Sequence, residues 1–479
     1  MRNSLAPAAE HAISVFCLGR RQWEEGGAPR GLDRAAVAFL RAQGFDAGLG
    51  KVGFAPGANG SLGAALFGLG AEAEPDPFLP GKLPGLLPPG CYRLEDWPGD
   101  QQLAVIAFLL GAYRFDRYRA RRDAGPRLAP PPGVDRAGVL RIAESVALGR
   151  DLINTPANDM GPKELAAAAL AVAKQYRATA KVVVGDDLLK DGFPLAHAVG
   201  RGSSRAPRLV DIRFGAASHP KVTLVGKGVV FDTGGLDIKP PAGMLLMKKD
   251  MGGAAAALAA ARMIMDAKLP VRLRVLLPIV ENAVGGDSFR PGDILKSRKG
   301  LTVEIGNTDA EGRLILADAL AAADEESPDL LIDFATLTGA ARVALGPDLP
   351  PFYTRSEELA AAIARAGERV NDPVWRLPLW RPYAAMLDSK IADTNNVSSG
   401  AFAGSITAAL FLSRFVEKAR EWAHFDIFGW TPVARSGRPE GGEPQAARLV
   451  HALIEQRCAH EWARSSSAEK SLRRPRARQ

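Results

Sequence analysis

Cysteine and histidine are scarce in this chain of 479 residues, and this limits the kinds of site that it can carry. The three cysteines, Cys17, Cys91 and Cys458, are scattered without a CxxC pair, which argues against a disulfide framework or a cysteine-rich zinc site. No histidine occurs between residues 220 and 423. Any metal ion in that region would be held by oxygen atoms, with or without an amine, which suits Mn or Mg and can also take Zn.

Long apolar runs are also missing. No stretch approaches the roughly 18 to 20 uninterrupted apolar residues that a membrane helix needs. The first residues, MRNSLAPAAEHAISVF, lack a basic region followed by a long apolar run and a small-residue cleavage site. We therefore expect a cytoplasmic protein with no membrane partner.

Positive charge is concentrated at the carboxyl end. Residues 464–479 carry six Lys or Arg against one Glu, which accounts for +5 of the formal charge of +8. The Ser, Arg and Pro content of this segment predicts a disordered tail, and the remaining charge is ordinary for so long a chain. The composition therefore argues against binding to nucleic acid.

Several common enzyme motifs fail on inspection. The segment HEWAR has Arg464 where a zinc-protease helix would need a second histidine. Lys227 lies in GKG and lacks the Ser or Thr that follows a P-loop lysine, and the chain contains no GxSxG.

Proline and glycine concentrate in AGPRLAPPPGVD, residues 124–135, which is typical of a linker. We place a domain boundary there. The predicted organisation is a small amino-terminal α/β domain (1–130), a linker and connecting helix (131–165), a larger domain with the candidate catalytic residues (166–460) and a basic disordered tail (461–479).

From residue 208 onward, apolar β-rich runs alternate with Ala-rich helical ones. We predict strands over 208–214, 221–228, 271–280 and 329–337, and helices over 252–268 and 313–326. Runs that are apolar on both faces predict an α/β fold with a mostly parallel central sheet flanked by helices. Ligands of such sheets bind beyond the carboxyl ends of the strands, where Lys227, Thr336 and Thr338 fall.

Charged residues gather in three glycine-flanked segments between residues 226 and 313. The segments are GKGVVFDTGGLDIKP with Lys227, Asp232, Asp237 and Lys239, LMKKDMGGA with Lys248, Lys249 and Asp250, and NTDAEGR with Asp309, Glu311 and Arg313. In an extended segment, residues two apart point to the same side, so Asp309 and Glu311 can reach one site, and Gly312 lets the backbone turn before the next helix. From spacing alone, solvated loops explain these charges as well as a shared site does.

The charge balance favours a shared site. Asp232, Asp250, Asp309 and Glu311 carry four negative charges, which two divalent ions would balance. Two such ions can share a water molecule and lower its pKa for hydrolysis. Lys239 and Arg313 remain as positive charge suited to an oxyanion or a small anion.

The segments VGKGVVFDTGGLDIKP, KKDMGGAAAA and above all NTDAEGRL closely resemble the motifs of the leucyl aminopeptidases, the cytosolic aminopeptidase family with two metal ions. The resemblance covers roughly residues 135–455. It implies an aminopeptidase that hydrolyses the first residue of peptides, with a preference for Leu and other apolar residues, through a water activated by two metal ions.

Site residues follow from this resemblance position by position. It implies a tighter metal ion bound by Lys227, Asp232, Asp250 and Glu311, and a second ion bound by Asp232, Asp309 and Glu311, with a backbone carbonyl of Asp309. The ions would be Mn or Zn, with Mg as a third candidate. A lysine ligand must be neutral, and an adjacent dication favours the uncharged amine.

The resemblance also implies the remaining roles. Lys239 would stabilise the tetrahedral intermediate, and Arg313 would hold a bicarbonate that acts as general base. Met247, Thr336 and Gly339 would line the pocket for the first side chain. A homohexamer is implied as well. A DNA-binding accessory protein on the same fold is the alternative function, and the modest charge outside the tail argues against it.

Overall fold

The computed structural model describes residues 2–7, 11–29, 31–57, 60–71, 75–119, 124–460 and 462, so the predicted basic tail lies outside the described residues apart from Trp462. The chain forms two compact units. The first comprises Met1–Ala147 and Pro432–Glu440, and the second comprises Leu148–Thr431 and Gly441–Gln479. Helix α4 (Arg136–Asn154) includes residues of both units.

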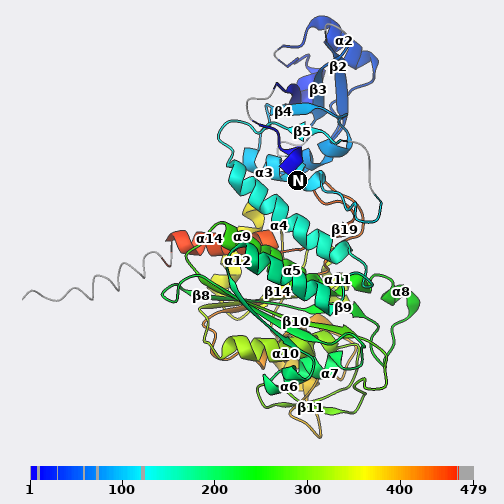
Figure 1. The fold of residues 1–479 in the computed structure, drawn as a ribbon. Helices are drawn as coiled ribbons and strands as arrows, with labels where there is room; N and C mark the ends of the chain where they lie inside the picture. Colours follow the sequence, from blue (N-terminus) through cyan, green and yellow to red (C-terminus); the bar gives the residue numbers. More distant parts are fainter. Residues whose placement is uncertain are drawn as a thin grey trace, which may run out of the picture. The chain divides into compact units, whose positions relative to one another are not determined.

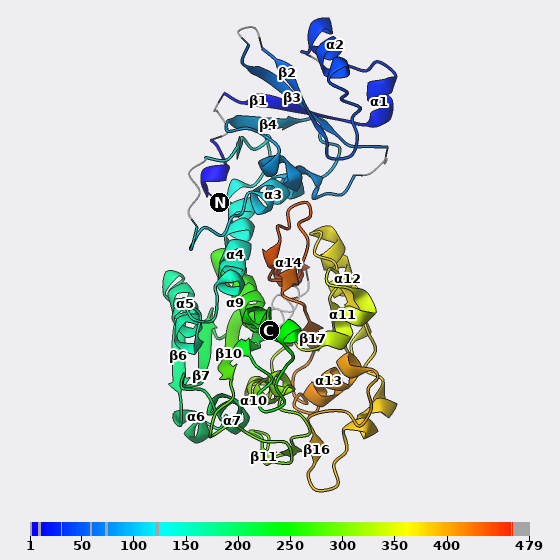
Figure 2. The same ribbon diagram turned by 90° about the vertical axis from the view of Figure 1, so that its right-hand side faces the viewer.

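The first unit contains a five-stranded sheet with helices on both faces (Figure 2). Its strands run in the order β2 (Val52–Pro56), β3 (Leu62–Gly68), β1 (Ile13–Leu18), β4 (Cys91–Glu95) and β5 (Arg127–Leu128). Its other elements are η1 (Arg2–Ser4), α1 (Arg20–Glu24), α2 (Arg34–Ala42), η2 (Leu79–Gly85) and α3 (Gln101–Gly111). Strand β5 falls within the segment predicted as a linker.

Alternation along β3 divides the core of this unit into two layers. Ala65 and Phe67 pack with the apolar helix α3, whereas Leu66 packs on the other face with Leu40 of α2. Successive side chains of a strand point to opposite faces, so a continuous apolar run is what a sheet covered on both faces requires.

The second unit contains a nine-stranded sheet. Its strand order is β15 (Trp375–Arg376), β14 (Pro351–Thr354), β17 (Trp422–Asp426), β13 (Leu330–Ala335), β8 (Lys221–Gly226), β10 (Arg272–Asn282), β7 (Arg208–Phe214) and β6 (Thr179–Val184), with β9 (Gly228–Asp232) also paired to β10. The central strands β17, β13, β8 and β10 are parallel, and β14, β7 and β6 are antiparallel to their inner neighbours. The predicted α/β fold with a mostly parallel central sheet is confirmed.

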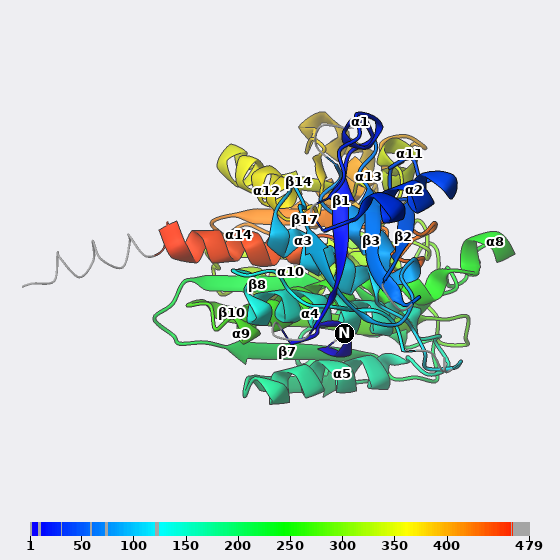
Figure 3. The same ribbon diagram turned by 90° about the horizontal axis from the view of Figure 1, so that it is seen from above.

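Helices cover both faces of this sheet (Figure 1). One side holds α5 (Pro162–Gln175), α9 (Gly252–Asp266) and α14 (Ala447–His460), with α5 beside β7 (Figure 3). The other side holds α7 (Pro194–Gly200) and α10 (Glu311–Asp324), against which α13 (Gly404–Ser413) packs. The remaining helices are α6 (Asp187–Lys190), α8 (Pro241–Met244), η3 (Met247–Met251), α11 (Gly339–Leu345), α12 (Glu357–Arg369) and η4 (Arg381–Leu387).

The Ala-rich composition of α9 has a structural reason. Every residue from 254 to 261 is fully buried, and small side chains let a helix approach a sheet closely. On the other face, Leu314 and Leu320 of α10 pack with Val225 of β8 and Val280 of β10. None of the described helices combines the length and the hydropathy of a membrane span.

A small sheet positions the NTDAEGRL segment. Its strands are β11 (Ile294–Lys296), β12 (Thr302–Glu304) and β16 (Thr394–Asn395), and the short strands β18 (Trp430–Thr431) and β19 (Gly441–Gly442) pair separately. Strand β12 leads directly into residues 306–310, and its pairing with β16 brings Asn396 beside them.

Candidate functional site

All ten predicted site residues line one pocket of about 320 Å³ in the second unit. They are Lys227, Asp232, Lys239, Met247, Asp250, Asp309, Glu311, Arg313, Thr336 and Gly339. Lys227 follows β8 and Thr336 follows β13, so the pocket lies at the carboxyl ends of the parallel strands. The βαβ pattern predicted a site at this edge of the sheet, and the ten residues meet there.

Lys227 is a buried lysine that joins two of the pocket carboxylates. Its Nζ is 2.7 Å from Asp250 Oδ2 and 3.0 Å from Glu311 Oε1, and the side chain is 3% exposed. Burial alone would lower the pKa of Lys227, but the Asp250, Glu311 and Asp232 carboxylates outweigh burial and raise it. Thr336 fixes Asp250 from the other side, because its Oγ1 donates to Asp250 Oδ1 at 2.8 Å.

A second lysine joins the other two carboxylates. Lys239 Nζ is 2.8 Å from Asp232 Oδ2 and also pairs with Asp309. Asp232 Oδ1 accepts hydrogen bonds from Asn282 Nδ2 and from the backbone N–H of Gly234, each at 2.8 Å. The orientation of Asp232 is thus fixed before any ligand binds.

Hydrogen bonds from distant residues hold the NTDAEGRL segment in place. Asn396 Oδ1 accepts from the backbone N–H of Gly306 at 2.8 Å, and its Nδ2 donates to the carbonyl of Asn307 at 2.8 Å. Thr308 is fully buried, and its Oγ1 donates to the carbonyl of Gly234 at 2.6 Å. Asn282, Thr308 and Asn396 were not predicted from the sequence, because their partners are 26 to 90 residues away.

The prediction of an extended segment through Glu311, with a turn at Gly312 before the helix, was wrong. Helix α10 already begins at Glu311, so Gly312 lies inside the helix and does not make a turn. A Cβ atom at Gly312 would lie 2.3 Å from Lys227 Cε, which shows that the missing side chain makes room for the lysine. Asp309 lies in the turn that precedes the helix, and this change of direction brings its carboxylate toward that of Glu311.

The acidic residues of the pocket fit a divalent cation. Carboxylate oxygens of Asp232, Asp309 and Glu311 all lie within 4.8 Å of one another. Burial, followed by the charge of Asp232, raises the pKa of Glu311 to about 8 and that of Asp309 to about 6. Glu311 Oε2 is buried and has no hydrogen-bond partner among the described residues. A metal ion would both bind this oxygen and stabilise the charged carboxylates.

Arg313 is a buried cation in the same pocket. Its Nη1 donates to the carbonyl of Asn396 at 2.6 Å, whereas its buried Nε has no partner among the described residues. Burial lowers the pKa of Arg313 to about 10, and Glu311 and Asp426 oppose this effect. A guanidinium with a free donor in a pocket is suited to a small anion.

The remaining wall contains cations that were not assigned a role from the sequence. Lys249 Nζ lies 5.0 Å and Arg342 Cζ 4.5 Å from the centroid of the Phe428 ring. All three residues line the pocket with Met247 and Gly339. Burial lowers the pKa of Lys249 to about 8; Asp250 opposes the shift and the charges of neighbouring cations add to it.

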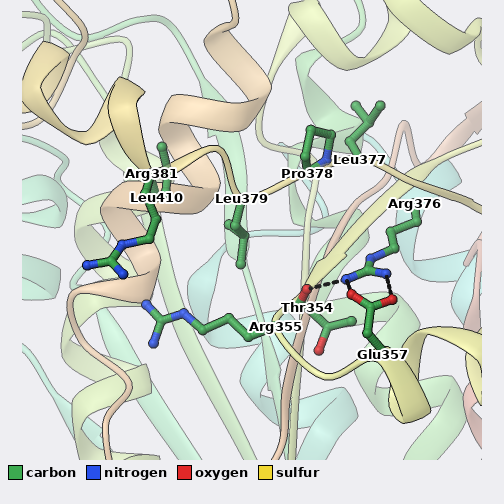
Figure 4. Close-up of a pocket in the computed structure, with 9 residues that line it drawn as sticks. All are labelled: Thr354, Arg355, Glu357, Arg376, Leu377, Pro378, Leu379, Arg381 and Leu410. Carbon is green, nitrogen blue, oxygen red and sulfur yellow. Dashed lines mark hydrogen bonds and ion pairs between the residues drawn. The ribbon is translucent and has the colours of Figure 1, made fainter.

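A larger pocket of about 810 Å³ is lined by residues of the neighbouring strands β14 and β15 and of the segments around them (Figure 4). Thr354, Glu357 and Arg376 line this pocket, and Arg376 forms an ion pair with Glu357. Thr354 pairs with Ala423 near the start of β17. None of the predicted site residues lines it. Size alone therefore does not identify the functional site.

Comparison with known proteins gives consistent matches. The chain is 42% identical over 371 residues to a probable cytosol aminopeptidase of Roseiflexus castenholzii, covering 74% of this chain and 75% of that protein. The crystal structure of the cytosol aminopeptidase from Coxiella burnetii superposes with a TM-score of 0.88 at 47% identity, covering 93% and 97% of the two chains. The bottromycin maturation enzyme BotP in complex with Mn matches with a TM-score of 0.84 at 34% identity, covering 94% and 100%.

Family profiles agree with these relatives. Residues 23–131 match the M17 aminopeptidase N-terminal domain. Because residues 147–454 match the catalytic domain of the cytosol aminopeptidase family, the chain belongs to that family.

Proposed function

We propose that this protein is a metal-dependent aminopeptidase that removes the amino-terminal residue of peptides, with leucine and other apolar residues among its substrates. The observation that carries the proposal is the convergence of Lys227, Asp232, Asp250, Asp309 and Glu311 in one pocket, with Glu311 Oε2 lacking a partner among the described residues. Met247 and Phe428 supply apolar surface for a leucine side chain. We assign catalysis to the predicted domain over residues 166–460.

The carboxylates would hold two divalent cations. We assign Lys227, Asp232, Asp250 and Glu311 to one ion, and Asp232, Asp309, Glu311 and the Asp309 carbonyl to the other. Mn and Zn are the first candidates and Mg the third; the Mn complex of the related BotP supports Mn. When bound, the ions would supply a nucleophile at neutral pH and polarise the scissile carbonyl.

The chain's own residues complete the proposed site. Lys239 would place its ammonium beside the carbonyl oxygen as negative charge develops there. Arg313 would hold bicarbonate, which would supply a general base when bound. Thr336 and Asn282 would keep Asp250 and Asp232 in position through the hydrogen bonds described above.

We also propose a cytoplasmic homohexamer. Large apolar side chains exposed in the second unit support an assembly, among them Val343 at 91%, Phe402 at 86% and Leu245 at 85% exposure. Sedimentation velocity on the purified protein would measure the number of subunits.

Activity on leucine p-nitroanilide tests the proposed reaction. We expect chelation to abolish hydrolysis and graded Mn, Zn or Mg to restore it. A peptide with an acetylated amino terminus should resist cleavage, because the free amine is needed for binding. Equal cleavage of the acetylated and free peptides would refute an exopeptidase that recognises the amine, and activity that survives complete metal removal would refute the metal site.

A further inference from the structure

Two cations on the wall of the site pocket differ from the other pocket lysines. Lys227 and Lys239 each pair with two carboxylates. Lys249 and Arg342 have no hydrogen bond or ion pair to a carboxylate within the part of the chain that the structure describes. Both instead lie over the ring of Phe428, a contact that attracts cations but does not satisfy their N–H donors.

Burial makes this arrangement costly for Lys249, which is 5% exposed. The neighbouring Asp250 makes no hydrogen bond or ion pair with Lys249 among the described residues, and its two oxygens bind Lys227 Nζ and Thr336 Oγ1. A buried ammonium without a hydrogen-bonded counter-ion is unfavourable. A ligand with a negative charge would make the contact to Lys249 that the free protein lacks.

Arg342 approaches the same space from helix α11. Its Nη2 lies 3.6 Å from the position that a Cβ atom would take at Gly339, one of the residues assigned to the pocket for the first side chain. Its guanidinium can bind a carboxylate through two parallel N–H donors. Arg313, whose Nη1 donates to the carbonyl of Asn396, is assigned to the small anion and is not part of this group of cations.

We propose that Lys249 and Arg342 form a carboxylate subsite beside Phe428 and that peptides beginning with Glu or Asp are preferred substrates. The inference rests on the proposed aminopeptidase function and specifies its substrate class. The methylene groups of glutamate would contact Met247 and Phe428 as a leucine side chain would, and the carboxylate adds a charged contact at the end. The carboxyl terminus of a dipeptide offers the same chemistry from a second source.

Matched substrates measure the contribution of the carboxylate. Glutamyl and glutaminyl p-nitroanilides differ only in the charge of the first side chain, and Leu-Gly and Leu-Gly amide differ only in the carboxyl terminus. We expect kcat/KM to be ~10-fold to 100-fold higher for the glutamyl than the glutaminyl substrate, the range of a charge-assisted hydrogen bond. A preference confined to Leu-Gly over its amide would assign the subsite to the carboxyl terminus.

Variants connect the preference to the two residues. Arg342→Met and Lys249→Met should each lower the glutamyl-to-glutaminyl ratio by about tenfold. Arg342 is exposed, so its variant should fold even if Lys249→Met does not. Arg365→Met is the matched control, because Arg365 is an exposed arginine on α12 that does not line the pocket, and its ratio should be unchanged.

Product binding separates this inference from the proposed function. Calorimetry on the metal-loaded protein should show tighter binding of glutamate than of glutamine, and Arg342→Met should remove the difference. If no peptide substrate is cut but this difference persists, the aminopeptidase proposal fails and the carboxylate subsite stands. Ratios near one for both substrate pairs, or ratios that neither variant changes, would overturn the subsite.

Discussion

Replacing Gly312 by alanine would separate the effect of a substitution on the site from its effect on the fold. The new Cβ atom would lie 2.3 Å from Cε and 2.7 Å from Nζ of Lys227. Carbon atoms in contact are separated by about 3.5 to 4.0 Å, so the lysine must move by at least ~1 Å. Its Nζ now lies 2.7 Å from Asp250 and 3.0 Å from Glu311, and a shift of that size disturbs this arrangement.

The expected loss of stability is small because two effects oppose each other. Alanine favours the helix over glycine by about 1 kcal/mol, whereas overpacking a buried position costs about 1 to 3 kcal/mol. The Lys227 side chain is flexible, so the backbone of α10 need not move. Activity should respond much more strongly, since a displacement of about 1 Å at a reacting site can lower the rate about 100-fold.

The assay compares three quantities on one preparation: bound metal, kcat/KM for leucine p-nitroanilide and the free energy of unfolding in urea. Gly312→Ala should lose about 100-fold in kcat/KM and bind metal more weakly, yet unfold within about 2 kcal/mol of the parent. Gly243→Ala is the control, because a Cβ atom there would lie 3.7 Å from its nearest neighbour, an ordinary van der Waals contact. Full metal occupancy and parental activity in Gly312→Ala would refute the assignment of Lys227 to the site.

Three further substitutions test which metal ion each carboxylate binds and how the ligand segment is held in place. Glu311→Ala should lose more metal than Asp309→Ala, because Glu311 is assigned to both ions and Asp309 to one; two bound ions in Glu311→Ala would remove the bridging assignment. Thr308→Val should cost about 1 to 3 kcal/mol in urea unfolding, since it leaves the Gly234 carbonyl and the Asp237 N–H without their partner. Unchanged stability would mean that the turn is held by its other contacts.

Much of the second unit follows from local sequence patterns. The strand predicted over 208–214 is β7, and the helix predicted over 252–268 is α9, which ends at Asp266. These elements are long and strongly periodic, and they bury apolar side chains in the way that the pattern requires. The βαβ order also placed Lys227 and Thr336 at the same edge of the sheet, because parallel strands end on the same side.

Contacts between distant segments could not be read from the sequence. Nothing local to Asn396 indicates that it holds Gly306 and Asn307, which are 90 and 89 residues earlier. Gly312 was interpreted as a turn residue because a glycine before a helix commonly has that role; its close approach to Lys227 depends on the packing of α10 beside the end of β8. The roles of the adjacent Lys248 and Lys249 could not be distinguished from the sequence. In the structure, Lys249 lies over the ring of Phe428, whereas Lys248 Nζ donates to the carbonyl of Asn154.

Lys239 is the residue for which metal binding and catalysis should separate most clearly. Its Nζ lies 2.8 Å from Asp232 Oδ2 and it pairs with Asp309, so it belongs to the charge network of the site without belonging to the proposed ligand set. Lys239→Ala should therefore retain two metal ions and near-normal substrate binding. It should lose about 10² to 10³ in kcat, the scale for removing one preorganised donor to an oxyanion.

The conservative variant Lys239→Arg is the informative companion. A planar guanidinium cannot place its charge where the compact ammonium does, so this variant should recover little of the lost kcat even though it retains the positive charge. Bound metal, KM and kcat should be measured on the same preparation of each variant. Loss of metal in Lys239→Ala would make the residue structural, and an unchanged kcat would remove it from the mechanism, because the carboxylates and Lys227 would then be sufficient for the reaction.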